Sequence, residues 1–173
     1  MNLQGKRVLV FGTGKSGIGA ADLLGETGAH VILFDGNEKT DKDAVLAKVS
    51  HAEDASVYAG ELPKEVLESL DLVILSPGVP TDIPIVKKFY EMGLPVWGEV
   101  ELAYRTGKGR VLAITGTNGK TTTTALLGKI MSDAEDSVFV VGNIGTPYTS
   151  KALEMKENST TVAEISSFQL ETI

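Results

Sequence analysis

Short apolar segments alternate with longer stretches of helical periodicity along the chain. Most of these segments are rich in β-branched residues and continuously hydrophobic, as in strands that helices cover on both faces. We expect strands at Arg7–Phe11, His30–Phe34, Ser56–Tyr58, Asp71–Leu75, Pro95–Trp97, Arg110–Thr115, Ser137–Val141 and Thr160–Ile165. Helical patterns occupy Ser16–Thr27, Asp41–Val49, Lys64–Ser69, Pro84–Met92, Glu99–Arg105, Lys120–Ala134, Pro147–Lys156 and Ser166–Ile173. This alternation predicts parallel, doubly wound α/β sheets.

Two domains are indicated by an interruption of this pattern. Loop-like residues surround the very short strand near Trp97, and a fresh strand–loop–helix pattern begins at Arg110. We therefore expect a first domain at residues 1–93, a linker at 94–107 and a second domain at 108–173. Only the last three expected strands fall in the second domain, and so few strands make a marginal core. We accordingly expect the chain to be a fragment of a longer protein.

Composition narrows the function classes. The chain is 42% hydrophobic and 23% charged, which is typical of a globular protein rather than a disordered one. It has neither an apolar stretch of membrane-helix length nor a signal-peptide pattern, so we expect a cytoplasmic protein without membrane insertion. The absence of cysteine excludes disulfides and thiolate metal sites. A net charge of −7 argues against nonspecific nucleic-acid binding but allows phosphate ligands held by backbone N–H groups.

A first glycine motif, Gly12-Thr13-Gly14-Lys15-Ser16-Gly17, follows the first expected strand and opens a helix. In a dinucleotide-binding fingerprint, Gly12 would allow the tight turn, Gly14 the approach of a phosphate, and Gly17 close packing of helix on strand. Asp35 ends the next strand, where a carboxylate can bind a nucleoside hydroxyl or base. The motif predicts nucleotide binding without distinguishing NAD from other nucleotides. A purely structural turn is the alternative.

A second glycine motif, residues 116–122 (GTNGKTT), also follows a strand and opens a helix. It is shorter than a Walker A loop, because Ile114 stands where that pattern needs its first glycine. The glycines leave backbone N–H groups free to point at phosphate, with the helix dipole behind them. Lys120 can reach terminal phosphates and the Thr121 hydroxyl can ligate magnesium. A glycine-rich turn with a solvated lysine is the alternative.

Three further features follow expected strands. Ser76-Pro77-Gly78 could offer N–H groups to a ligand, and Asn143 could orient a polar substrate, although each could also form a plain turn. Glu164, near the end of the last strand, is a candidate magnesium ligand, unless it is a surface residue on an edge strand. Because the carboxyl ends of parallel strands meet at one edge of a sheet, we expect all these features at the edge that carries the ligand crevice.

The remaining polar and aromatic residues suggest no chemistry. We interpret His30 and His51 as structural or solvated, and Trp97 as packing within the linker. Glu99 and Glu101 are most simply a solvated helix face. The sequence contains no arrangement typical of a Ser-His-Asp or Cys-His nucleophile.

The second motif resembles the phosphate loop of the Mur ligases and the folylpolyglutamate synthetases. Residues 76–79 (SPGV), 98–102 (GEVEL), 142–145 (GNIG) and 164–171 (EISSFQLE) follow in the order typical of the Mur ligases. Asn118 favours the members that add D-glutamate, since the alanine-adding members usually have histidine there. The resemblance covers essentially the whole chain but only the N-terminal part of the family's three-domain length. It implies a Rossmann-like parallel sheet domain followed by the start of a P-loop-type α/β ATP-binding domain.

The resemblance also implies an ATP-dependent amide ligase of peptidoglycan synthesis, and hence of cell-wall biogenesis, cell shape and cell division. The alanine carboxylate of UDP-N-acetylmuramoyl-L-alanine would attack the γ-phosphate of ATP, and the amine of D-glutamate would displace phosphate from the acyl phosphate. Catalysis would involve Lys120 and Glu164, and Mg²⁺ would be held by Thr121 and Glu164. ATP would contact Gly116, Thr117, Asn118, Gly119, Lys120, Thr121 and Thr122. The UDP-muramoyl-alanine substrate would contact Gly14, Lys15, Ser16, Gly17, Asp35, Ser76, Gly78, Asn143, Ser166 and Gln169.

Some family features are missing or altered. After Asp35 come Gly36 and Asn37, where some relatives carry a polar and a basic residue. The family's histidine metal ligand, modified lysine and glutamate-binding domain would lie beyond Ile173. We therefore expect a monomer whose partners are small molecules, and which binds nucleotide at best without completing the ligation. An NAD-dependent oxidoreductase built on the first glycine motif and a non-catalytic nucleotide-binding module stay as alternatives.

Overall fold

The computed structural model describes residues 2–143 and 145–173. The chain divides into two compact units, Met1–Glu99 and Val100–Ile173, here called the first and second unit. In both sheets the strands run parallel to their neighbours, which confirms the predicted α/β fold class. Each strand predicted from the sequence is found, with ends that differ by no more than one residue. Within the described residues, no helix combines the length and apolarity needed to cross a membrane.

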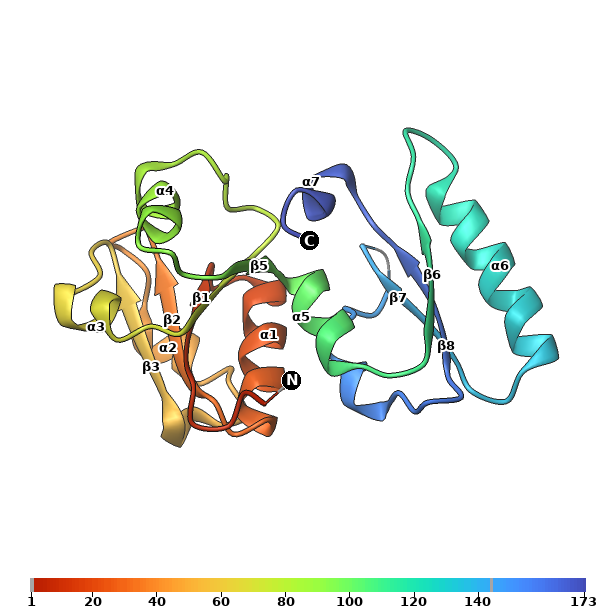
Figure 1. Cartoon of the computed structure of the whole chain (residues 1–173), viewed down its shortest axis with the longest axis horizontal. Helices are drawn as coiled ribbons and strands as arrows, with labels where there is room; N and C mark the ends of the chain where they lie inside the picture. The colour runs from red at the N-terminus through yellow and green to blue at the C-terminus, as the bar shows by residue number, and fades with distance from the viewer. Residues whose placement is uncertain (1, 144) are drawn as a thin grey trace. The chain divides into compact units, whose positions relative to one another are not determined.

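The first unit is built on a five-stranded sheet (Figure 1). Its strands, in spatial order, are β3 (Ala55–Ala59), β2 (His30–Asp35), β1 (Arg7–Phe11), β4 (Leu72–Leu75) and β5 (Val96–Gly98). Its helices are α1 (Lys15–Glu26), α2 (Lys42–Leu46), α3 (Lys64–Glu68) and α4 (Pro84–Glu91), with a short 3-10 helix η1 (Ala52–Asp54). Because β2 and β4 flank β1, the strand order reverses at β1. In sheets of this type ligands bind at the carboxyl ends of the strands at the reversal point.

Apolar residues on both faces of the central strands form the core of the first unit. Leu9 and Phe11 of β1 belong to a buried cluster with residues of α3 and α4, and the ring centroids of Phe11 and Phe34 are 4.8 Å apart. Val10 points to the opposite face, where α1 lies with Ala21 fully buried. Helices on both faces explain why the strand sequences are continuously apolar.

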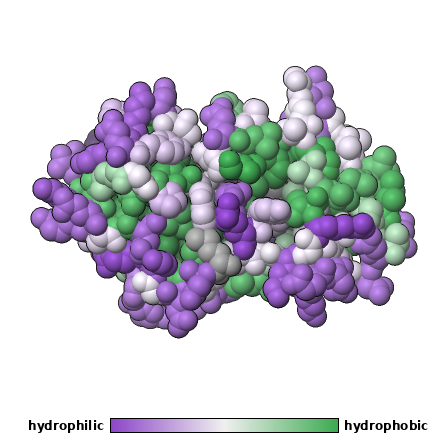
Figure 2. Space-filling model, viewed as in Figure 1, coloured by the Kyte–Doolittle hydropathy of each residue, from purple (hydrophilic) through white to green (hydrophobic). Residues whose placement is uncertain are grey.

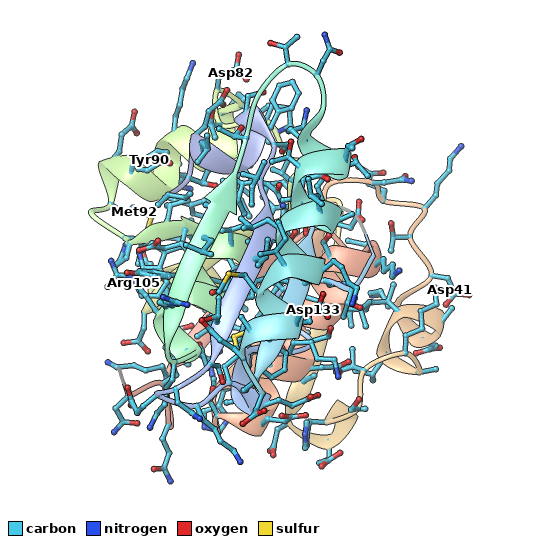
Figure 3. All side chains as sticks on the ribbon, turned by 90° about the vertical axis from the view of Figure 1, so that its right-hand side faces the viewer. Asp41, Asp82, Tyr90, Met92, Arg105 and Asp133 are labelled. Carbon is cyan, nitrogen blue, oxygen red and sulfur yellow. The ribbon has the colours of Figure 1, made fainter. Side chains whose placement is uncertain are left out.

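The second unit contains a three-stranded sheet in the order β6 (Arg110–Ile114), β8 (Thr160–Glu164), β7 (Val138–Gly142). Helix α6 (Lys120–Ala134) packs on one face of this sheet, as the view of Figure 3 shows, with Asp133 near its C-terminal end. The other face is covered by the segment around the 3-10 helix η2 (Ala152–Glu154), where Met155 Sδ accepts a hydrogen bond from Thr161 Oγ1. The remaining helices are α5 (Glu99–Thr106) and α7 (Ser167–Leu170).

The sheet of the second unit is covered less completely than that of the first. Leu126 and Ile130 of α6 are 61% and 53% exposed, and Val140 of β7 is 43% exposed. Figure 2 shows hydrophobic side chains at the surface of this unit. β6 is at most half-buried along its length, whereas β8 is buried throughout. The small size of this core agrees with the expectation from three strands.

Two local predictions are wrong. The helix expected at Pro147–Lys156 is a series of turns with one short 3-10 helix, because both the backbone N–H and the hydroxyl of Ser150 donate to the Pro147 carbonyl. Glu101 is not solvated: it is 6% exposed and ion-paired with Arg105, one turn along α5. The strand and the helix expected within the linker at residues 94–107 are both present, as β5, which pairs with β4 in the first sheet, and as α5.

Candidate functional site

The first glycine motif forms the turn between β1 and α1 in the first unit. Gly12 adopts φ of +110°, a conformation that favours glycine. A Cβ atom on Gly17 would lie 1.9 Å from the Gly12 carbonyl oxygen and 3.1 Å from Ser76 Oγ. Gly14 has open space around its Cα and is exposed. The backbone of Gly17 therefore packs directly against that of Gly12, whereas the backbone of Gly14 is exposed and free of neighbours.

Asp35 is joined to this turn by the side chain of Thr13, to which the sequence assigned no role of its own. Thr13 Oγ1 donates to Asp35 Oδ2 at 2.6 Å, and the backbone N–H of Asn37 donates to Asp35 Oδ1 at 3.0 Å. Both carboxylate oxygens are therefore oriented by the protein. Each oxygen keeps a further lone pair with which to accept a hydrogen bond. The predicted nucleoside contact and the predicted phosphate contact are linked through one hydroxyl.

A cavity of about 350 Å³ adjoins the same turn and is lined by Thr13, Gly14, Lys15, Ile18 and Lys48. Gly14 and Lys15 were expected at a ligand site. Lys48 was not, because it comes from the turn after α2 and belongs to no motif.

The other predicted contacts of the first unit lie beside this turn. Ser16 is half-buried in the first turn of α1. Ser76 follows β4, and its Oγ is buried with no hydrogen-bond partner among the described residues. The Ser76 N–H donates to the Phe11 carbonyl at 3.0 Å, which holds the loop after β4 against the end of β1. Gly78 is exposed in open space.

In the second unit, the second glycine motif links β6 to α6. Gly119 has φ of +75° and occupies the N-cap position of α6, while Gly116 has φ of +148°. Residues 116–119 are exposed, as are Thr121 and Thr122. Lys120 folds back over the loop, its Nζ donating to the Gly116 carbonyl at 2.7 Å. The first turn of α6 carries no acidic residue, so nothing there opposes an anion at the helix N-terminus.

Glu164 ends β8, the central strand of this sheet, and is 1% exposed. The alternative that it lies on the surface of an edge strand is therefore wrong. It is in register with Ile114, the last residue of β6, and with Gly142, the last residue of β7. Its Oε2 is buried and has no hydrogen-bond partner among the described residues, and its Oε1 is 3.4 Å from Asn143 Nδ2. A buried carboxylate oxygen without a partner is costly, which is a signature of a functional group.

Close packing of backbone fixes Asn143 and Glu164 together. The Asn143 N–H donates to the Glu164 carbonyl at 2.9 Å. A Cβ atom on Gly142 would lie 2.2 Å from that same carbonyl oxygen. Ile144, the next residue of this motif, lies outside the described residues. Within the described part of the chain no three His, Cys, Asp or Glu side chains converge as a metal cluster would require.

Ser166 and Gln169 form a reciprocal capping box at the start of α7. Ser166 Oγ accepts from the Gln169 N–H at 3.3 Å, and Gln169 Oε1 accepts from the Ser166 N–H at 2.9 Å. The Ile165 N–H donates to the Ile114 carbonyl at 2.9 Å, which places this capped turn directly after the end of β6 and β8. Ser166 and Gln169, both predicted to contact the substrate, thus fix the backbone between the end of β8 and the start of α7.

Two titratable groups outside these motifs have shifted pKa values. Burial raises the pKa of Tyr148 to about 12, with the nearby Tyr104 adding to the effect and a hydrogen bond with Thr161 opposing it. The Arg7 backbone N–H and the Lys6 ammonium hold the pKa of Asp71 below its usual value. Asp71 lies just before β4, at the end of the sheet opposite the glycine turn.

Comparison with known families matches the two units separately. The model of the Mur ligase MurD-like N-terminal domain matches residues 6–98, and that of the Mur ligase middle domain matches residues 114–172.

Curated relatives match the chain from end to end. The UDP-N-acetylmuramoylalanine–D-glutamate ligase of Lachnospira eligens is 55% identical over 173 residues, and that of Lachnoclostridium phytofermentans is 53% identical over 173 residues. Each alignment covers 100% of this chain but only 38% of the relative, so the chain spans well under half the length of these relatives.

Solved structures share the fold at low identity. A murein peptide ligase from Psychrobacter arcticus matches with a TM-score of 0.53 and 20% identity, covering 94% of this chain and 37% of that chain. The UDP-N-acetylmuramate–alanine ligase MurC from Thermotoga maritima matches with a TM-score of 0.50 and 23% identity, covering 93% and 37%.

Proposed function

Because the chain belongs to the Mur ligase family, we propose that it is the N-terminal part of a UDP-N-acetylmuramoylalanine–D-glutamate ligase. The complete enzyme would couple ATP cleavage to amide formation between UDP-N-acetylmuramoyl-L-alanine and D-glutamate, through an acyl phosphate. The buried carboxylate of Glu164 carries this proposal, because it ends the strand next to the one that leads into the phosphate loop. A plain α/β fold gives no reason to bury an unpaired carboxylate oxygen there.

The first unit binds the UDP end of the substrate in this proposal. The bare backbone at Gly14, with Lys15 and Ser16 in the first turn of α1, receives the diphosphate. Asp35 accepts a hydrogen bond from the nucleoside, while Ser76 and Gly78 border the same turn. Two observations support this division: Ser76 Oγ is buried without a hydrogen-bond partner among the described residues, and the carboxylate oxygens of Asp35 can each accept a further hydrogen bond.

The second unit binds ATP in this proposal. Backbone N–H groups of residues 116–119 and the N-terminus of α6 face the phosphates, with Thr122 alongside. Lys120 moves its ammonium from the Gly116 carbonyl to the phosphoryl group in transfer, whose developing charge it stabilises electrostatically. The carboxylate of the substrate attacks that phosphorus and displaces ADP, and the amine of D-glutamate then displaces phosphate from the acyl phosphate to form the amide. Residues of the complete enzyme outside this chain complete the reaction.

The donor atoms near the loop fit a magnesium ion. Mg²⁺ prefers oxygen ligands and is usually held by one or two carboxylates together with substrate phosphates. Oε2 of Glu164, which has no hydrogen-bond partner among the described residues, and the hydroxyl of Thr121 make such a set, and we propose that they hold the ion. When bound, magnesium supplies positive charge against the phosphate oxygens.

The muramoyl-alanine arm reaches the second unit at Asn143 in this proposal. The exposed side chain of Asn143 offers amide donors beside Glu164. Ser166 and Gln169 border the same region, their capping box fixing the turn that follows β8. In keeping with small-molecule substrates, we propose a monomer that works in the cytoplasm.

Thermal unfolding with added ligand tests the substrate class. UDP-N-acetylmuramoyl-L-alanine at ten times its dissociation constant should stabilise the chain by about 1.4 kcal/mol, whereas NAD should have no effect. Stabilisation by NAD alone would contradict the proposal and favour an oxidoreductase built on the same glycine turn.

A substitution in the full-length enzyme tests the division of labour. Lys120→Ala should abolish acyl-phosphate formation and leave UDP-substrate binding unchanged. Lys129→Ala is the matched control, because Lys129 is an exposed lysine of the same helix and is ion-paired with Asp133. If Lys120→Ala removed substrate binding as well, the assignment of the two ligands to separate units would be wrong.

A further inference from the structure

Two lysines from distant parts of the sequence line the cavity of the first unit. Lys15 opens α1, and Lys48 comes from the turn after α2, yet both border the same space of about 350 Å³ beside Gly14. Both are exposed. Lys48 belongs to no motif and has no role in the function proposed above.

Neither ammonium group is neutralised within the described part of the chain. Five other lysines are ion-paired: Lys6, Lys64, Lys108, Lys129 and Lys151. Asp22, one turn beyond Ile18 on α1, accepts a hydrogen bond from the Ser50 N–H at 2.7 Å and makes no ion pair with Lys48. In a protein of net charge −7, two unpaired cations at one cavity form a local positive site.

The backbone that carries Lys48 is held firmly against α1. Val45 and Val49, on either side of it, are buried, and the Lys48 N–H donates to the Val45 carbonyl at 3.0 Å. The Ser50 hydrogen bond to Asp22 fixes the same turn to α1. Lys48 is therefore positioned at the cavity by the fold, with only its flexible side chain left to adjust.

We propose that Lys48 is a phosphate-binding residue, which forms with Lys15 a clamp for the diphosphate of a nucleoside diphosphate. This inference deepens the proposed function, on which it rests, by adding a contact that the glycine motif does not contain. Gly14 lines the same cavity as the two lysines, and the open space around it lets a diphosphate approach the backbone. Two ammonium groups match two adjacent phosphates, whereas an uncharged nucleoside would gain nothing from them.

Calorimetric titration of the full chain with UDP and with uridine tests the clamp. Lys48→Met keeps most of the apolar stem and removes the charge. It should weaken UDP binding about tenfold, as expected for loss of one charged hydrogen bond, and leave uridine binding unchanged. Lys48→Arg should restore most of the affinity for UDP. Lys87→Met is the matched control, since Lys87 is exposed on α4 and does not line the cavity.

The outcomes separate this inference from the function on which it rests. If the unaltered chain binds UDP and Lys48→Met binds it equally well, the clamp is refuted while the proposed function stands. Equal weakening for UDP and uridine would also refute it, because Lys48 would then act on the fold or the base. If the unaltered chain binds NAD but not UDP, the proposed function fails, and a Lys48-dependent affinity for NAD would still support the clamp. Binding of no diphosphate at all would refute both.

Discussion

Replacing either of two glycines of the turn after β1 by alanine should impair a different property of the first unit. A methyl group on Gly17 would lie 1.9 Å from the Gly12 carbonyl oxygen, whereas a methyl group on Gly14 would meet nothing within 4 Å. Neither residue has the left-handed backbone that disfavours alanine. The Gly17→Ala variant should therefore lose fold stability, and the Gly14→Ala variant should lose nucleotide binding.

The stability loss at Gly17 can be estimated from the contact. Overpacking costs typically 1–3 kcal/mol, and the upper end of about 3 kcal/mol applies here because a backbone carbonyl cannot rotate away. Alanine recovers about 1 kcal/mol through its higher helix propensity. About 2 kcal/mol of destabilisation remains, which for a unit of about 100 residues lowers Tm by roughly 8–16 °C. At Gly14, the N-cap position of α1, alanine should cost only about 0.5 kcal/mol.

The single tryptophan provides the assay. Trp97 belongs to β5 of the first unit, so its fluorescence on heating reports the unfolding of that unit in the intact chain. Titration with UDP-N-acetylmuramoyl-L-alanine then measures binding in both variants. Coincident melting curves for the two variants would show that the close approach of Gly17 to Gly12 does not limit stability. Full binding by Gly14→Ala would show that no phosphate approaches that backbone.

Three further substitutions test other parts of the structure. Gly142→Ala would place a Cβ atom 2.2 Å from the Glu164 carbonyl oxygen at a backbone φ of +117°. It should destabilise the second unit by about 3 kcal/mol in urea unfolding. The control Gly145→Ala, where a Cβ atom meets open space, should cost only about 1 kcal/mol. Burial raises the pKa of Tyr148 from 10.0 to about 12, so the fold favours the neutral phenol and the free energy of unfolding should fall as the pH rises from 10 to 12. Tyr148→Phe should reduce this fall, and a pH profile that the substitution leaves unchanged would refute the assignment. Because the pKa of Asp71 is lowered, its charged form stabilises the fold at neutral pH, and this contribution should vanish as the pH falls through the lowered pKa. The Asp71→Asn variant should therefore have a lower Tm than the unaltered chain at neutral pH and the same Tm in acid.

The strands and their loops could be predicted because their signals are local. A continuous apolar run such as Arg7–Phe11 indicates a buried parallel strand, and a glycine turn at its end indicates the carboxyl edge of the sheet. The position of Asp35 at the end of β2 follows from the same reasoning. Even the start of α7 could be inferred, since serine is a favoured N-cap, and Ser166 takes that position.

The remaining features depend on pairing between distant residues. Nothing local distinguishes a central strand from an edge strand, so the burial of Glu164 became visible only with the order of the second sheet. The bond from Thr13 to Asp35 joins residues 22 positions apart. Lys48 reaches its cavity because the turn after α2 is hydrogen-bonded to α1 through Ser50 and Asp22. The helix expected at Pro147–Lys156 does not form, because the Ser150 hydroxyl donates to the Pro147 carbonyl and so competes with the backbone hydrogen bonds of a helix.

The position of β8 between β6 and β7 has a consequence for how the second unit acquires its structure. β6 and β7 are consecutive strands of the chain, but β8 lies between them in the sheet and pairs with both, its first residue, Thr160, being in register with Arg110 of β6. Pairing of β6 with β8 must close the chain from Arg110 to Thr160, whereas β7 pairs with β8 across a shorter connection. β6 therefore makes the most distant pairing of this sheet and should join it slowly. During synthesis the first unit can complete its sheet before β8, the strand that pairs with β6, has been made. The second glycine motif can then be fixed beside Glu164 only once that residue has been made, so the site proposed for the UDP substrate would form before the site proposed for ATP.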